Sequence, residues 1–178
     1  MLKTEKVNKT IQMFRDYVIK EAKDNLTRSG HNNTSSLSNS IKGEIVNDNS
    51  YTIVGFKMND YGTFVDLGVK GKTSSNKAPD SPYKFGSGTG QKGGLTRGIE
   101  QWVQQKGFQF RDKQGKFLSY KSTAYLITRS IFNKGIKPSL FFTKPFEAGY
   151  KKYIDIDLIK AFGQDIDTMV DYNLKNIK

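Results

Sequence analysis

The chain has 178 residues, no cysteine and a formal net charge of +12. This length suits one domain with a hydrophobic core, and the lack of cysteine excludes a disulfide framework and a thiolate metal site. Apolar runs of only a few residues argue against a membrane span, and MLKTEKVNKT lacks the apolar centre of a signal peptide, so we expect a protein that works inside a cell or in a particle assembled there.

The N-terminal region has the pattern of a long amphipathic helix over residues 5–28. Apolar residues recur there at steps of three and four, which places them on one stripe. The residues of this stripe are Val7, Ile11, Phe14, Val18 and Ala22. Gly30 ends the helix, because glycine takes the left-handed conformation after a helix at little cost.

A β-hairpin is predicted next. The stretch LSNSIKGEIV puts Ile41 and Ile45 on one side of a first strand, and SYTIVGF supplies a second strand rich in β-branched and aromatic residues. The intervening NDNS, residues 47–50, is favourable turn chemistry. Two strands alone form a marginal sheet, so helix packing or a further strand must complete it.

A short helix and then a long loop follow the hairpin. In NDYGTFVDLG, Asn59 or Asp60 can cap a helix that ends at Gly68. Residues 69–94 are rich in glycine and lysine and have no periodicity, which is typical of a flexible functional arm.

The loop contains the spacing of a dinucleotide fingerprint, Gly88-x-Gly90-x-x-Gly93. That fingerprint requires a buried strand before it, whereas the preceding segment contains Pro79 and Pro82 and no β-branched run. We therefore favour a flexible loop over a nucleotide site.

Further helices are expected in the second half of the chain. Residues 95–107 form one helix, a turn at 112–115 indicates a small hairpin, and STAYLITRSIFNKG forms the next helix. Ser122 or Thr123 would lie near the cap of this helix, its apolar stripe would hold Ala124, Ile131 and either Ile127 or Leu126, and Gly135 would end it.

The C-terminal region is predicted to hold two helices. A short one would have Pro145 in its first turn. A longer amphipathic one would begin at Asp155, with Asp155 and Asp157 matching the positive end of its dipole.

These elements predict an α+β fold. A small antiparallel sheet would pack against the long N-terminal helix and the C-terminal helices in a single domain, 1–178. A flexible Gly/Lys-rich arm would be inserted at about 69–94, within an extended basic region, 69–120.

The positive charge is confined to the middle of the chain. Residues 69–152 contain 17 Lys or Arg and 4 Asp or Glu. Such a field attracts phosphate or an acidic protein surface, although a solvated face that only keeps the protein soluble has the same composition. Within the arm, we expect the partner-binding residues to be Lys70, Lys72, Lys77, Lys84 and Lys92.

The sequence offers little catalytic chemistry. His31 is the only histidine and lies among Asn and Ser, with no nucleophile motif nearby. The carboxylates that a magnesium nuclease would need are scattered, as at Asp60, Asp66, Glu100 and Asp112. We therefore expect no catalytic residue, cofactor or metal, and a binding or structural protein rather than an enzyme.

Aromatic residues alternate with basic ones in FQFRDKQGKFLSYK and FFTKPFEAGYKKY. Exposed rings of this kind would stack on the bases of single-stranded nucleic acid while the lysines follow its backbone. Core phenylalanines beside solvated lysines are the interpretation we favour, because no nucleic-acid motif of known spacing accompanies them.

Four stretches, in order, resemble the tail-completion, or head–tail joining, proteins of the tailed-bacteriophage neck, including those similar to minor tail protein Z. They are the N-terminal helix, NTSSLSNSIKGEI, YGTFVDLG and GIKPSLFFTKPFEAGYKKY. Ser35 stands where the family usually has glycine, and Asp66 where it has glutamate. The motif residues that match are Thr34, Leu37, Ser40, Ile41, Tyr61, Phe64, Val65, Gly68, Pro138, Phe141 and Phe142.

The resemblance implies a structural virion protein without catalysis. Copies would form a ring, a hexamer or dodecamer, that joins the tail tube or tail terminator to the head connector and passes DNA through its channel. The protein would assemble in the host cytoplasm and reside in the neck or tail of the virion, with no membrane partner. The alternative from the composition is a small basic DNA-binding protein.

Overall fold

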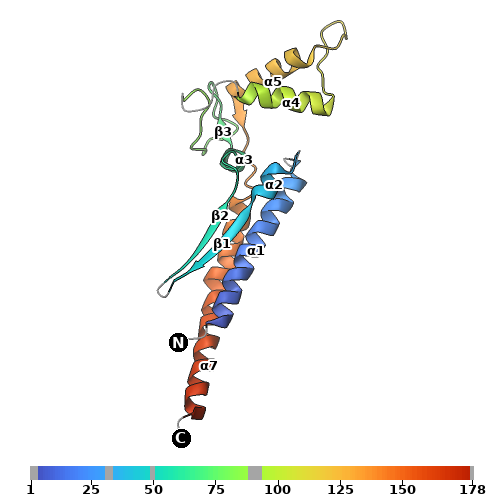
Figure 1. Cartoon of the computed structure of the whole chain (residues 1–178). Helices are drawn as coiled ribbons and strands as arrows, with labels where there is room; N and C mark the ends of the chain where they lie inside the picture. Colours follow the sequence, from blue (N-terminus) through green and yellow to red (C-terminus); the bar gives the residue numbers. More distant parts are fainter. Residues whose placement is uncertain (1–3, 31–33, 49–50, 88–93, 177–178) are drawn as a thin grey trace. The chain divides into compact units, whose positions relative to one another are not determined.

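A computed structural model describes residues 4–30, 34–48, 51–87 and 94–176. By its internal contacts the chain divides into two compact units, where we expected a single domain. Unit 1 combines Met1–Gly62 with Leu140–Lys178, and unit 2 is the continuous segment Thr63–Ser139 between them. The expected mixture of a long N-terminal helix, C-terminal helices and a small antiparallel sheet is confirmed (Figure 1).

Unit 1 is built on helix α1, Glu5–Arg28, as the sequence predicts. Its buried residues follow the predicted stripe and include Ile11, Phe14, Val18 and Ala22. The helix ends where Ser29 N–H donates to Asn25 O, and Gly30 follows with a positive φ of 71°. This is the left-handed position that glycine takes with least strain.

The predicted hairpin is present in unit 1. After the short helix α2, Ser36–Ser40, strands β1, Lys42–Asn47, and β2, Thr52–Lys57, pair antiparallel with Ile45 opposite Val54 and Val46 opposite Ile53. Gly43 lets β1 lie close to α1, because a Cβ there would be 2.6 Å from Arg15 Cγ. Packing on α1 thus provides the support that two strands lack alone.

The C-terminal part of unit 1 differs from the prediction. Helix α6, Thr143–Gly149, continues through a π-helical stretch η1, Tyr150–Asp157, into α7, Leu158–Asn176. No helix begins at Asp155, so the matching of Asp155 and Asp157 to a helix start was wrong. The stretch Tyr150–Asp157 contains no glycine or proline, so the helix does not end there but continues as wider π-helical turns.

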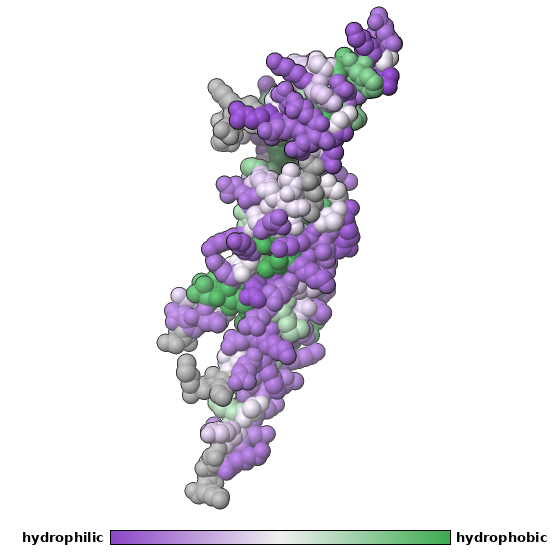
Figure 2. Space-filling view, turned by 45° about the vertical axis from the view of Figure 1, so that its right-hand side comes forward, coloured by the Kyte–Doolittle hydropathy of each residue, from purple (hydrophilic) through white to green (hydrophobic). Residues whose placement is uncertain are grey.

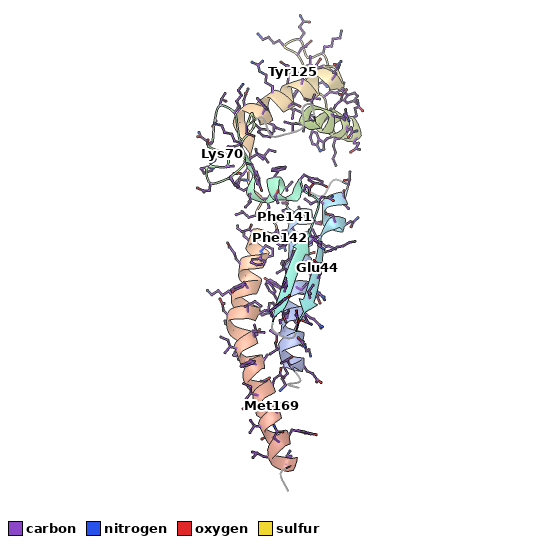
Figure 3. All side chains as sticks on the ribbon, turned by 60° about the vertical axis from the view of Figure 1, so that its left-hand side comes forward. Glu44, Lys70, Tyr125, Phe141, Phe142 and Met169 are labelled. Carbon is purple, nitrogen blue, oxygen red and sulfur yellow. The ribbon has the colours of Figure 1, made fainter. Side chains whose placement is uncertain are left out.

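Aromatic rings join the three parts of unit 1. The centre of the Phe14 ring on α1 lies 6.0 Å from that of Phe56 on β2 and 5.7 Å from that of Phe146 on α6. Both pairs are T-shaped, with the edge of one ring against the face of the other. Phe142, labelled in Figure 3 at the start of the C-terminal helix, stands 5.4 Å from Phe56. Such contacts add to the hydrophobic free energy of the core.

A buried carboxylate caps α1 from the opposite end of the sequence. Thr4, at the N-cap position, makes no capping hydrogen bond with its side chain. Asp165 of α7 is buried and instead accepts hydrogen bonds from Lys6 N–H at 3.3 Å and Val7 N–H at 3.1 Å. A carboxylate is favoured there because the helix N-terminus carries unsatisfied N–H groups and partial positive charge.

Unit 2 contains α3, Gly62–Leu67, which starts at the last residue of unit 1, and the helices α4, Gly94–Lys106, and α5, Tyr120–Lys134. The two-residue strands β3, Val69–Lys70, and β4, Gly135–Ile136, pair antiparallel. Gly68 and Gly107 follow α3 and α4 with positive φ, as predicted for helix ends. The cap of α5 is Ser119, whose Oγ accepts from Ser122 N–H, so Ser122 lies near the cap as predicted.

The segment predicted to be a structureless arm is partly ordered by hydrogen bonds. Lys70 pairs through its main chain with Tyr83 O at 2.8 Å and Phe85 N at 2.9 Å, and Ser81 Oγ donates to Gly68 O at 2.7 Å. The glycine- and lysine-rich composition gives no sign of this pairing, because the hydrogen bonds join main-chain groups that are far apart in the sequence. Gly88, Gly90 and Gly93 lie outside the described residues.

We predict that Asp165→Ala lowers the free energy of unfolding by about 1–2 kcal/mol, because two N–H groups at the start of α1 lose a charged acceptor. Asp167→Ala is the matched control, since Asp167 is exposed on the same helix and should change stability by less than about 0.5 kcal/mol. Urea unfolding followed by far-UV circular dichroism measures both. Equal stabilities of the two variants would contradict the capping role.

Candidate interaction surfaces

The residues that carry the phage resemblance fall at junctions between elements. Leu37, on α2, and Ile41, directly before β1, are both buried. Ser40 Oγ donates to Leu37 O at 2.7 Å and accepts from Asn59 N–H at 3.0 Å, which ties α2 to the segment after β2. These residues therefore fix the position of the hairpin within unit 1.

The third and fourth matched stretches, YGTFVDLG and GIKPSLFFTKPFEAGYKKY, meet within unit 2. Ser139 donates to Val65 O from both its N–H, at 3.1 Å, and its Oγ, at 2.7 Å. A Cβ on Gly68 would be 2.6 Å from Ile136 O and 2.7 Å from Pro138 N, so this junction requires glycine. Tyr61 and Phe64 are exposed.

In unit 1, the aromatic residues of the fourth stretch hold the C-terminal helix. Phe141 is 1% exposed and its carbonyl accepts from Asn25 Nδ2 of α1 at 3.3 Å, while Phe142 contacts Phe56. Phe141 and Tyr153 are buried, so the core interpretation of FFTKPFEAGYKKY is confirmed for them.

The predicted partner-binding lysines lie in the described part of the arm, with one exception. Lys70 and Lys84 are joined by a parallel bridge, which brings two of these lysines to neighbouring backbone positions (Lys70 is labelled in Figure 3). Lys72 and Lys77 are exposed, and Lys72 Nζ stands 5.8 Å from the centre of the Phe132 ring. Lys92 lies outside the described residues.

Unit 2 holds most of the positive charge of the chain. Thr63–Ser139 contains 14 Lys or Arg and 4 Asp or Glu, a net charge of +10 of the total +12. Apart from half-buried Lys70, all of its described Lys and Arg residues are exposed. The charge is therefore available at the surface to a polyanionic partner.

The most distinctive surface of unit 2 lies on α4 and on the loop that connects it to α5. We call Trp102, Phe108, Phe110 and Phe117 the aromatic surface. Their side chains are 37%, 41%, 37% and 55% exposed. The interpretation of the phenylalanines in FQFRDKQGKFLSYK as core residues was wrong, and the stretch instead presents its rings to solvent.

Three rings of the aromatic surface, those of Trp102, Phe108 and Phe110, contact one another in series. The Trp102 and Phe108 rings are 6.1 Å apart, and Phe108 and Phe110 are 5.2 Å apart at a near-perpendicular angle. The Arg111 guanidinium lies 3.9 Å from the centre of the Phe117 ring, a cation–π contact. Apolar faces and cations thus alternate along one short segment.

Hydrogen bonds give this loop a defined shape. Leu118 N–H donates to Phe110 O at 2.8 Å and Asp112 N–H to Lys116 O at 2.9 Å, as in the small hairpin that the sequence predicts. Phe110 N–H donates to Oγ1 of the fully buried Thr123 at 3.2 Å, which anchors the loop to α5. The rings are therefore held on a structured loop rather than on a flexible chain.

Unit 1 exposes a different kind of surface. Val46 and Ile53 face each other across the outward side of the hairpin and are 52% and 53% exposed, and Tyr51 beside the tip is also exposed. Figure 2 shows this hydrophobic surface along the hairpin. On α7, Ile159, Phe162, Val170 and Leu174 are exposed as well.

The described residues contain no group of three or more His, Asp or Glu placed to hold a metal ion. None of the helices in the described ranges has the length and apolar character needed to cross a membrane. His31, the single histidine, lies outside these ranges.

Comparison with known proteins gives no relative for this chain. No protein-family model matches it, and no curated protein or solved structure does so either. The resemblance to phage neck proteins therefore stays a prediction that depends on the residues described above.

We predict that Thr123→Val destabilises unit 2 by about 1–3 kcal/mol, because Phe110 N–H loses its acceptor. Thr128→Val is the matched control on the same helix, since Thr128 Oγ1 is buried without a hydrogen-bond partner and its removal should be neutral or stabilising.

Trp102 is the only tryptophan, so its fluorescence during urea unfolding reports on unit 2. If Thr123→Val were as stable as Thr128→Val, the proposed anchor of the loop would be refuted.

Proposed function

We propose that the protein is a structural component of a tailed-phage virion that completes the tail or joins it to the head, as a ring of identical subunits in the neck. The observation that carries this proposal is the placement of the matched motif residues. They form the junctions that position the hairpin and the C-terminal helix against α1. The function itself comes from the resemblance.

The surface of unit 1 supports a role in assembly. Among the described residues no further strand pairs with either edge of its hairpin, and the outward side carries the exposed pair Val46 and Ile53. Edge strands and exposed apolar side chains favour pairing with another protein chain. The apolar residues exposed on α7 provide a second surface, and a ring subunit requires two different surfaces to contact its two neighbours.

A small basic DNA-binding protein is the second candidate. The net charge of +10 on unit 2 favours it, because Lys and Arg bind phosphates and release counterions. In a neck ring the same charge would face either DNA in the channel or an acidic surface of a neighbouring virion protein.

Native mass spectrometry of the purified protein tests the choice, over a range of concentrations and salt. A discrete closed oligomer such as a hexamer or dodecamer, little changed by salt and present without DNA, supports the ring. A protein that stays monomeric at every concentration and binds duplex DNA only at low salt would favour the second candidate.

We predict that the double variant Val46→Thr with Ile53→Thr weakens self-association about tenfold or more for each subunit contact. Threonine keeps the β-branched shape that suits a strand but removes apolar area from the proposed contact. Sedimentation velocity at several concentrations measures the change.

The matched control is Tyr125→Ala, which removes an exposed ring from α5 of unit 2. Its self-association should equal that of the wild type. If the hairpin variant also associates like the wild type, the hairpin is not the contact surface. Circular dichroism confirms that each variant is folded.

A further inference from the structure

We propose that the aromatic surface of unit 2 binds single-stranded nucleic acid. This inference goes beyond the proposed function and does not depend on it, because it concerns the chemistry of one loop and one helix. The occupant is assigned from the kind of side chain exposed there, the cations beside them and the structure of the loop.

The exposed groups are rings rather than aliphatic chains. Trp102, Phe108, Phe110 and Phe117 all lie between residues 102 and 117, and each is more than a third exposed. A docking groove for a protein helix is typically lined by aliphatic and methionine side chains as well. Exposed aromatic rings are unfavourable in water, and the unpaired bases of a nucleic acid stack on such rings whatever the base sequence.

Exposed cations lie close to the rings along the chain, and acidic residues are few there. Lys106, Arg111, Lys113, Lys116 and Lys121 are exposed on the same loop and on the adjoining ends of α4 and α5. The one acidic residue of the loop, Asp112, accepts hydrogen bonds from Gln114 N–H and Lys116 N–H through Oδ1. Its carboxylate therefore helps shape the turn between the cations. The partner must accordingly be a polyanion with apolar faces.

The arrangement favours a single strand over a duplex. In a duplex the faces of the bases are covered by stacking, so rings gain nothing there and only the phosphates bind. In a single strand the bases can leave their own stack and lie on the rings while the phosphates remain near the lysines. The Arg111 guanidinium over Phe117 adds a planar cation that can stack in the same way.

Fluorescence anisotropy with a labelled thymidine 20-mer and a duplex of equal length tests the proposal on the full chain. At about 0.15 M salt we expect the single strand to bind at least tenfold more tightly than the duplex, and binding to quench the fluorescence of Trp102. Equal affinity for the two, with unchanged Trp102 fluorescence, would overturn the proposal in favour of a surface that reads phosphate alone.

Two variants separate stacking from charge. Phe108→Leu with Phe110→Leu keeps apolar volume but removes two rings, and should weaken single-strand binding at least tenfold while the dependence of log affinity on log salt keeps its slope. Lys113→Gln with Lys116→Gln should weaken binding and reduce that slope by about two phosphate contacts. Unchanged single-strand affinity of the leucine variant would also overturn the proposal.

The matched control for the rings is Phe64→Leu, which alters an exposed ring of unit 2 on α3, packed on Tyr83 at 4.6 Å. It should bind the single strand like the wild type. Polyglutamate, an acidic chain without bases, is the competing probe. If it displaces the oligonucleotide at an equal concentration of charges, the surface recognises acidic protein instead, and the proposal is wrong.

Discussion

The packing of Phe14 is the constraint on which unit 1 depends. Its ring touches Phe56 of the hairpin and Phe146 and Tyr150 of the C-terminal helix, so one side chain holds three elements that are far apart in the sequence. Gly149 makes this approach possible, since a Cβ there would be 3.2 Å from the Phe14 ring and 2.9 Å from that of Tyr17. The outer faces of the hairpin and of α7 carry exposed apolar residues outside this core.

Local signals in the sequence were sufficient for α1 and the hairpin. The stripe through Phe14 and Val18 has the helical period, and the turn residues at 47–50 separate two strand-like runs. The continuity of the C-terminal helix and the capping of α1 by Asp165 were not predictable in this way. In the sequence, Asp165 looks like any other acidic residue of an exposed helix. Its capping role arises only because α7 packs against the start of α1, a contact between residues far apart in the sequence.

The surfaces were harder to predict than the fold. Composition correctly placed the charge in the middle of the chain, but it directed attention to the lysines of the arm, where Lys70 proves to be part of a short strand. The phenylalanines at 108, 110 and 117 were assigned to the core because no nucleic-acid motif of known spacing accompanies them, yet they are exposed. A signal against that assignment was available, since FQFRDKQGKFLSY is short, rich in charge and built around a tight turn, and so has no continuous face to bury.

The insertion of unit 2 has a consequence for the order of folding. The two hydrogen bonds from Ser139 to Val65 hold its ends together, so a folded unit 2 replaces a long open loop with a short connection between the halves of unit 1. Loop closure then costs less entropy. During synthesis, α1 leaves the ribosome long before Phe146 exists, and the part of its apolar stripe that the C-terminal helix covers stays exposed until the last part of the chain is made. If unit 2 folds in the meantime, the C-terminal helix has a shorter conformational search before it packs on α1 and covers this stripe.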